Sequence, residues 1–221
     1  MPDRVFNLVV LISGNGSNLQ AIIDQINAGD LPAKICAVIS NREDAFGLQR
    51  ARKANIPVVV IKHTQYETRQ AFDDALSQTI DKYQPDLVVL AGFMRILTDT
   101  FVKHYLGKLI NIHPSLLPRY QGLNTHQRAL DAGDVEHGAT VHYVTPALDS
   151  GPIILQASVP VHENDTAEQL QERVHQVEHQ LYPEAIRRIV NGEISLQGQT
   201  VYCGTRPITK TEIQYTDLTF S

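Results

Sequence analysis

Five short segments in the first half of the chain are apolar at nearly every position: residues 5–13, 35–39, 58–61, 87–90 and 109–113. Such continuous runs are typical of parallel strands that are covered on both faces. After the first run, Leu19, Ile22, Ile23 and Ile26 recur at helical spacing, and Gly29 predicts the end of that helix. Further helices are expected over residues 46–54 and 68–83. Strands that alternate with helices predict an α/β fold with a doubly wound, mostly parallel sheet.

The pattern changes in the second half of the chain. Residues 140–144 and 153–161 are predicted strands with only a turn-rich segment between them, so we expect an antiparallel C-terminal extension of the sheet. A long helix is expected over residues 166–191, with Asp165 as its N-cap, a kink at Pro183 and a stop at Gly192. Residues 200–221 form a weakly patterned tail without an assigned element. No internal boundary stands out, so residues 1–221 are expected to form a single domain.

Composition narrows the class of protein. The net charge of −5 argues against a nucleic-acid partner, which requires clustered Lys and Arg. No apolar run approaches the ~18–20 residues of a membrane span, and the first run breaks at residues 13–16 without a signal-peptide cleavage pattern. Cys36 and Cys203 are too few and too far apart in sequence for a disulfide framework, which indicates reduced thiols. We expect a cytoplasmic enzyme acting on small molecules, and the sequence leaves open whether it is a monomer or a homodimer.

The candidate chemistry centres on the end of the fifth predicted strand. Asn111 and His113 lie two residues apart, so a strand would present both side chains on one face. Pro114 favours extended backbone at His113 and closes the strand. The pair would therefore lie at the carboxyl end of a strand, where open α/β sheets bind ligands.

A carboxylate completes this candidate site. Asp149 follows the sixth predicted strand, and a sheet of this type would bring its loop near the fifth strand. A carboxylate beside an imidazole raises the histidine pKa and favours the cation. Asn111, His113 and Asp149 would then stabilise a developing oxyanion and shuttle a proton, which suits transfer of an acyl or formyl group.

A glycine-containing turn joins the first predicted strand to the first helix at residues 14–18. Glycine allows close backbone approach, and a helix N-terminus favours an anion. Leu19 occupies the place of the third glycine of a dinucleotide fingerprint, and no Walker lysine follows, so a single phosphate is the better interpretation. A purely structural turn remains the alternative. Ser40, Asn41 and Arg42 follow the second strand, where an NADP enzyme holds its 2′-phosphate, and they support a rival interpretation as a nicotinamide oxidoreductase.

Residues 175–179 match the H-x-x-E-H pattern of some zinc proteases. The spacing places His175 and His179 one helical turn apart, as metal binding requires, but no third ligand is evident. The polar face of a long helix is the simpler explanation. His175 and Glu178 are also candidates for binding a substrate amine or hydroxyl groups.

From about residue 9 to residue 183 the chain resembles the phosphoribosylglycinamide formyltransferase family, the folate-dependent enzymes of purine synthesis. The resemblance rests on four motifs in order: VLISGNGSNLQAI at 10–22, LAGFMRIL at 90–97, LINIHPSLLP at 109–118 and EHG at 136–138. It implies direct transfer of the formyl group of 10-formyltetrahydrofolate to the amine of glycinamide ribonucleotide through a tetrahedral intermediate, without a metal. It also implies the doubly wound fold already predicted.

The resemblance assigns roles to particular residues. Asn111, His113 and Asp149 match the family's catalytic trio, with His113 as the proton donor. The ribonucleotide would be bound by Gly16, Ser17, Asn18, His175, Gln176, Val177 and Glu178. The folate would be bound by Arg69, Met94, Arg95, Ile96, Leu97, Asn111, Thr145, Pro146, Ala147, Leu148 and Asp149.

The chain departs from the family's pattern near Gly122, where Gln121 and Asn124 replace an expected proline and histidine. This change concerns closure of a loop beside the site. Two alternatives stay open. A formyltetrahydrofolate hydrolase is one, although the first strand begins too early to leave room for the usual N-terminal regulatory module. A non-catalytic folate- or nucleotide-binding protein on the same fold is the other.

Overall fold

The structure is a computed structural model that describes residues 5–208. The chain divides into two compact units, and the boundary falls between Asn111 and Ile112. The larger sheet has the strand order β3-β2-β1-β4-β5-β6-β7, and a second sheet has the order β10-β9-β8. This mixed α/β architecture confirms the predicted fold class. The single-domain organisation stays a prediction.

Five parallel strands form the sheet of the first unit, and each coincides with a predicted apolar run. They are β1 (Phe6–Ile12), β2 (Ala33–Ser40), β3 (Val58–Val60), β4 (Leu87–Leu90) and β5 (Leu109–His113), whose last two residues belong to the second unit. All residues from Leu8 to Ile12 are 0% exposed. A strand covered on both faces is expected to be apolar throughout, as β1 is.

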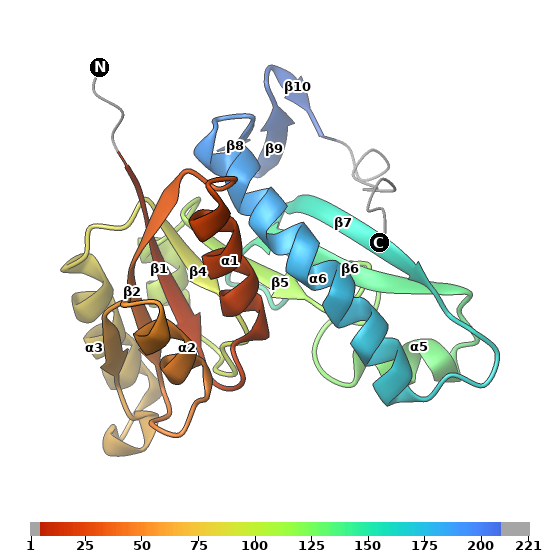
Figure 1. Cartoon of the computed structure of the whole chain (residues 1–221), viewed down its shortest axis with the longest axis horizontal. Coiled ribbons are helices and arrows are strands. Elements are labelled where there is room, and N and C mark those ends of the chain that lie inside the picture. Colours follow the sequence, from red (N-terminus) through yellow and green to blue (C-terminus); the bar gives the residue numbers. More distant parts are fainter. Residues whose placement is uncertain (1–4, 209–221) are drawn as a thin grey trace. The chain divides into compact units, whose positions relative to one another are not determined.

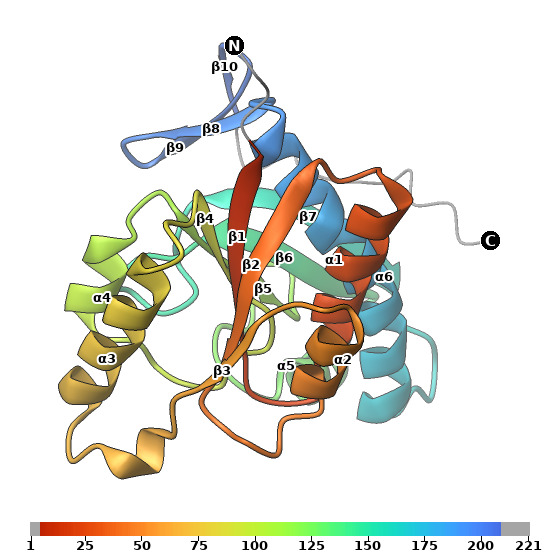
Figure 2. The same cartoon turned by 60° about the vertical axis from the view of Figure 1, so that its left-hand side comes forward.

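Helices cover both faces of this first sheet. Figure 2 shows α1 (Ser17–Ala28) and α2 (Gly47–Lys53) on one side of β1 and β2, with α3 (Arg69–Asp81) and α4 (Asp99–His104) on the other. The short 3-10 helix η1 (His63–Gln65) follows β3. Thr68 and Thr98 begin α3 and α4, since each side chain accepts a hydrogen bond from a backbone N–H of the first turn. Because the strands are parallel, the loops that follow them gather at one edge of the sheet.

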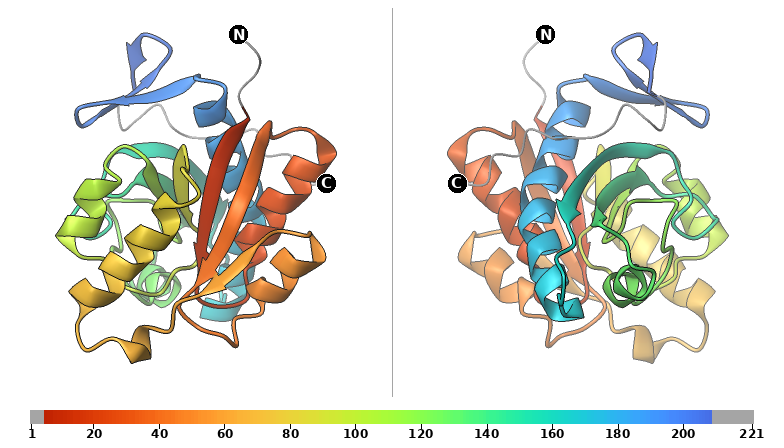
Figure 3. Two further views of the ribbon diagram at one scale, coloured as in Figure 1. Left: turned by 90° about the vertical axis from the view of Figure 1, so that its left-hand side faces the viewer. Right: turned by 90° about the vertical axis from the view of Figure 1, so that its right-hand side faces the viewer.

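The second unit is built on an antiparallel pair, β6 (Glu136–Tyr143) and β7 (Ile153–Pro160), as the sequence predicts. The long helix α6 (Ala167–Val190) packs against both strands and against α5 (Thr125–Asp131). Its course along β7 is visible in the right-hand view of Figure 3. A small sheet follows α6, formed by β8 (Ile194–Gln197), β9 (Thr200–Cys203) and β10 (Arg206–Pro207), and Figure 1 labels its three strands.

The predicted N-cap of α6 is wrong by one residue. Thr166 caps the helix by accepting the N–H of Gln169, while the Gln169 side chain accepts the N–H of Thr166 in return. Asp165 instead pairs with Arg173 at 2.8 Å and accepts the N–H of His162. The N-cap is therefore Thr166, which exchanges two hydrogen bonds with Gln169, and not the acidic residue before it.

Part of the tail has structure that the sequence did not predict. Strands β9 and β10 lie within residues 200–208, and the rest of the tail, residues 209–221, lies outside the described residues. Cys36 and Cys203 are both free thiols. None of the helices within residues 5–208 is long and apolar enough to cross a membrane.

Candidate active site

The predicted phosphate loop lies at the carboxyl end of β1, directly before α1. Gly16 is the N-cap of α1, with φ of 72°, and no side chain caps this helix. Ser17 is the first residue of the helix, and Asn18 is 9% exposed. A helix N-terminus that begins on glycine presents backbone N–H groups and the positive end of its dipole, which is the arrangement that binds phosphate.

A second glycine fixes the path of this loop. A Cβ added to Gly16 would lie 2.7 Å from the Cα of Gly47, the first residue of α2. The N–H of Gly47 donates to the carbonyl of Gly14 at 3.0 Å. Arg50, one turn further along α2, donates from Nε to the carbonyl oxygen of Asn15 at 3.0 Å and from Nη2 to its Oδ1 at 2.9 Å. The loop is therefore built against α2, and side chains larger than glycine would not fit at the contact.

The segment after β4 carries the predicted folate residues Met94, Arg95, Ile96 and Leu97. Met94 and Ile96 are 72% and 61% exposed, so two apolar side chains of this segment are accessible to a ligand. The segment ends at Thr98, whose N–H donates to Oδ2 of Asp73 on α3 at 2.6 Å. Met94 and Ile96 are thus displayed on a loop whose end is tied to a helix.

Asp73 is a buried carboxylate beside this segment. It is 1% exposed, and burial raises its pKa, while the hydrogen bond from Thr98 and the charges of Arg69 and Arg95 oppose that rise. Arg69, another predicted folate residue, is the first residue of α3 and is exposed. The electrostatic effect of both arginines at Asp73 links the two predicted folate segments of the first unit.

Asn111 and His113 both lie in β5, as the sequence predicts. Asn111 pairs with Leu90 of β4 and is half-buried, and His113 is 5% exposed at the end of the strand. The i, i+2 spacing of a strand gives the two side chains the same face of β5.

The structure brings His113 and Asp149 together within the second unit. Nδ1 of His113 lies 3.4 Å from Oδ2 of Asp149, and both side chains are at least 90% buried. Nε2 of His113 lies 2.9 Å from the carbonyl oxygen of Tyr120, so Nε2 carries a proton that it donates to that carbonyl. An oxygen atom therefore lies beside each ring nitrogen of His113.

Asp149 is held in place by the loop that contains Gly122. Its Oδ2 accepts the N–H of Gly122 at 2.9 Å, and its carbonyl oxygen accepts Nε2 of Gln121 at 3.1 Å. Its backbone has φ of 45°, a conformation that non-glycine residues rarely adopt. Gln121, one of the two departures from the family's pattern, thus anchors this loop to Asp149.

Further histidines surround this pair, and sequence reasoning missed all but one of them. Nε2 of His142 lies 3.9 Å from Oδ1 of Asp149, and burial lowers the pKa of His142. The rings of His126 and His137 meet edge to face at 5.2 Å, and burial lowers the pKa of each to about 4. The charges of His113 and His175 contribute to the shift at His126. Only the tertiary fold assembles this cluster, and no local motif in the sequence signals it.

The predicted ribonucleotide residues of α6 differ in exposure. His175 is half-buried, and Gln176 is exposed. Val177 and Glu178 are 0% and 4% exposed, and Val177 belongs to the core of the second unit. The ring of His175 stacks on that of His179 at 6.4 Å. Within residues 5–208, no group of three or more His, Cys, Asp or Glu side chains has a geometry suited to a metal ion.

A cavity of about 870 Å³ in the second unit contains four of the five predicted folate residues of the loop after β6. Thr145, Pro146, Ala147 and Asp149 line it together with Gln121. The opposite wall comes from the small C-terminal sheet and the residues around it: Gln199, Thr200, Val201 and Ile208. The sequence left this wall unassigned because short strands in a weakly patterned tail carry little periodic signal.

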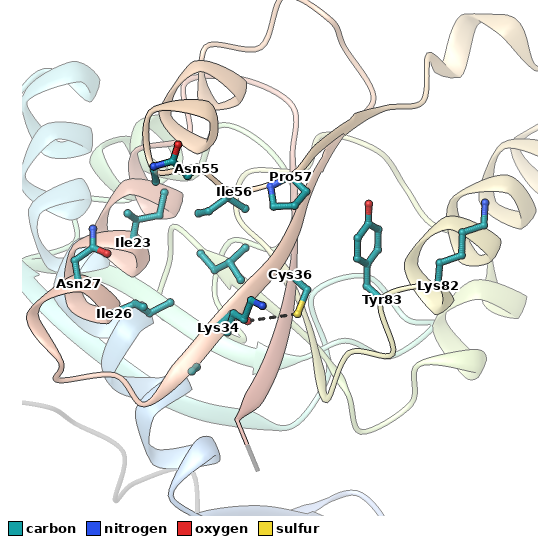
Figure 4. A pocket seen from close by; sticks show the side chains of 13 residues that line it. Ile23, Ile26, Asn27, Lys34, Cys36, Asn55, Ile56, Pro57, Lys82 and Tyr83 are labelled. Atoms are coloured by element: carbon teal, nitrogen blue, oxygen red, sulfur yellow. Dashed lines mark hydrogen bonds between the residues drawn. The ribbon is translucent and has the colours of Figure 1, made fainter. Parts of the chain in front are cut away.

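A second cavity, of about 660 Å³, lies in the first unit and contains none of the predicted residues. Figure 4 shows Lys34 and Cys36 of β2 there, with Ile23 of α1. Residues 33–35 pair with the beginning of β1. The cavity therefore lies at the amino ends of the strands, at the edge opposite the phosphate loop.

Comparison with known proteins identifies the class of enzyme to which this fold and these residues belong. The model of the formyl transferase family matches residues 6–186, and the chain belongs to this family. The prediction of a formyltransferase is confirmed.

Within that family the chain is similar to phosphoribosylglycinamide formyltransferases. It is 53% identical over 190 residues to that enzyme of Escherichia coli strain K12, with 86% of this chain and 90% of that protein covered. It is 46% identical over 203 residues to that of Haemophilus influenzae, with coverage of 92% and 96%. The structure of the Coxiella burnetii enzyme in complex with CHES has a TM-score of 0.91 at 51% identity, covering 96% of this chain and 99% of that one.

Proposed function

We propose that the protein transfers the formyl group of 10-formyltetrahydrofolate to the amine of glycinamide ribonucleotide in purine synthesis. The observation that carries this proposal is the buried pair of His113 and Asp149, in which both ring nitrogens of His113 face oxygen acceptors. Formyl transfer develops negative charge on the formyl oxygen, and a buried N–H donor is suited to stabilise it. Membership of the formyl transferase family supports the same reaction.

The reaction begins when the primary amine of the ribonucleotide attacks the formyl carbon. A C–N bond forms, and the oxygen of the tetrahedral intermediate accepts hydrogen bonds from the Asn111 amide and from His113. One proton leaves the attacking nitrogen through water near Asp149, and one proton reaches N10 of the folate. The C–N10 bond then breaks and tetrahydrofolate leaves. Holding the two reactants in register supplies a large part of the barrier reduction.

The carbonyl of Tyr120 has a defined place in this scheme. It accepts the Nε2 proton of His113 at 2.9 Å. We propose that His113 donates this same proton to the formyl oxygen, which then replaces the carbonyl as the acceptor when the donor binds. Displacement restores a hydrogen bond to Nε2, so His113 is not left unpaired in either state.

The remaining assignments belong to the same proposal. Gly16, Ser17 and Asn18 bind the phosphate, and residues 175–178 of α6 bind the ribose and glycinamide end, with Val177 contributing to the shape of the helix from the core. Arg69, residues 94–97 and residues 145–149 bind the folate. No metal takes part, and the enzyme works in the cytoplasm on small-molecule substrates.

Absorbance measurements on the purified protein test the proposal. A 10-formyl-folate is mixed with the protein, with and without glycinamide ribonucleotide, and deformylation is followed. We expect deformylation that depends on the ribonucleotide. Deformylation at an equal rate without the amine would identify a hydrolase, and binding of both compounds without turnover would identify a binding protein.

A further inference from the structure

A chain of hydrogen bonds crosses the first unit along the carboxyl edge of its sheet. It connects the segments that follow β4, β1, β2 and β3 in that order, which is also their order in the sheet. Its side chains are Ser13, Asn41 and His63. Ser13 and Asn41 are 6% and 4% exposed. Buried polar groups that are fully paired fix the geometry around them.

Ser13 is the central member of this chain and joins two predicted binding segments. Its backbone N–H donates to the carbonyl of Gly92 at 3.1 Å, and its Oγ accepts the N–H of Met94 at 2.8 Å. Gly14, the next residue, begins the predicted phosphate loop. One residue therefore holds the start of the phosphate loop and the start of the folate segment by two separate hydrogen bonds.

Asn41 and His63 orient the Ser13 hydroxyl. Because Oγ already accepts the N–H of Met94, the hydroxyl proton points to Oδ1 of Asn41, 2.6 Å away. Nδ1 of His63 lies 3.1 Å from the Asn41 amide nitrogen and 3.1 Å from the Asn41 backbone carbonyl oxygen, so this ring nitrogen has a partner on Asn41 in either tautomer. Both polar atoms of the Asn41 amide group therefore lie within hydrogen-bonding distance of protein atoms. Arg42, the last residue of the Ser-Asn-Arg motif, pairs with Asp44, so the motif has its partners within the protein.

We propose that Ser13 is a positioning residue that sets the phosphate loop and the 94–97 segment in register, with Asn41 and His63 fixing the direction of its hydroxyl. This inference rests on the proposed function, since it assumes that the two segments bind the ribonucleotide and the folate. In this proposal Ser13 does not need to touch a substrate. It acts through the backbone at Met94 and at Gly14.

The main test compares Ser13→Ala with Ser40→Ala. Ser40 is also fully buried at the end of β2, and its Oγ accepts one backbone N–H, that of Arg42, at 3.1 Å. Both variants lose a buried hydroxyl and leave an N–H without its acceptor, so both should lower the melting temperature. Only Ser13→Ala frees Met94. We expect it to raise KM for the formyl donor about tenfold and KM for the ribonucleotide a few-fold, while Ser40→Ala leaves both KM values within about twofold of wild type.

A second variant keeps the test decisive if Ser13→Ala fails to fold. Asn41→Ala removes the acceptor of the Ser13 hydroxyl but leaves Oγ in place, and we expect it to raise KM for the donor about threefold. In the double variant the Asn41 substitution should add nothing to the effect of Ser13→Ala, because its effect passes through the missing hydroxyl.

Equal KM values in the Ser13 and Ser40 variants, or unchanged KM values in Asn41→Ala, would overturn the inference. Additive effects in the double variant would overturn the role of Asn41. These outcomes differ from a failure of the proposed function, in which the wild-type protein itself transfers no formyl group.

Discussion

The two units hold their predicted functional groups mainly with different chemistry, although the network of the first unit also ends at a histidine, His63. In the first unit, glycine contacts and the neutral hydrogen bonds of Ser13 and Asn41 hold the loops in place. In the second unit, His113 and its carboxylate partner lie near further buried histidines. Neutral amides and hydroxyls do not titrate near neutral pH, whereas histidine does. We therefore expect the first unit mainly to position the substrates and the second unit to carry out the proton transfers.

The largest expected effect is on turnover, and it should follow substitution of a histidine in the second unit but not of one in the first. His113→Ala should reduce turnover at least ~10²-fold, because it removes the donor to the developing oxyanion. Dissociation constants for both substrates, measured by titration calorimetry, should stay near wild type. The matched control is His104→Ala, which removes an exposed histidine paired with Asp81. Unchanged turnover in the His113 variant would exclude His113 from the mechanism.

The next largest effect is expected on stability, from the contact between Gly16 and Gly47 in the first unit. Gly16→Ala adds a Cβ that would lie 2.7 Å from backbone at Gly47, on a residue with φ of 72°. We expect a loss of about 1–3 kcal/mol in the free energy of unfolding, together with weaker ribonucleotide binding. Gly14→Ala is the control, since its Cβ would meet no atom within 4 Å. Equal stability of the two variants in urea denaturation would show that the loop is not built against α2.

Acid should weaken the second unit before the first. Burial lowers the pKa values of His126 and His137 from the ordinary value of 6.5 to about 4, so the fold favours their neutral forms. Their contribution to stability is complete above about pH 6.5 and is lost as the pH falls towards 4. Hydrogen exchange at pH 7.5 and pH 5 should show α5 and β6 losing protection while β1 keeps it. The double variant His126→Gln/His137→Gln should lack this difference, and a pH-independent wild type would contradict the argument.

The smallest effect concerns Asp73. Burial raises the pKa of Asp73 above its ordinary value of 3.8, so the fold favours the protonated carboxyl. The stability that this protonation contributes is complete below pH 3.8 and is lost as the pH rises through the pKa of Asp73 in the folded protein. Asp73→Asn keeps an acceptor for Thr98 and removes this pH dependence. We expect a change within about 1 kcal/mol at pH 7. Asp73→Ala should cost more because it leaves the Thr98 N–H without its acceptor, and the reverse order of stability would be inconsistent with this account.

The sequence predicted the parts of the fold that carry a strong periodic or continuous apolar signal. Strands β1 to β5 and helix α6 belong to this group. Helices α4 and α5 span only 6 and 7 residues and carry little periodic signal, although α2, which also has 7 residues, was predicted. The C-terminal sheet was missed for the same reason.

The candidate site was predicted unevenly. Local spacing alone was enough to select the glycine loop and the pair of Asn111 and His113. The carbonyl of Tyr120 at His113 was not predictable, because every residue has a carbonyl and only the fold decides where it points. The rings of His126 in α5 and His137 in β6 are in contact, and the spacing of these residues in the sequence does not predict this contact. Motifs thus predict chemistry within one strand or turn, whereas partners from other elements require the structure.

The fate of the formyl carbon tests the central claim most directly. Wild-type protein is incubated with glycinamide ribonucleotide and a folate donor whose formyl carbon is labelled with carbon-13, and the products are followed by NMR. The account predicts that the label appears on the amine nitrogen of the ribonucleotide at the rate at which the donor is consumed. Label that appears as free formate, or a donor that stays intact, would contradict it.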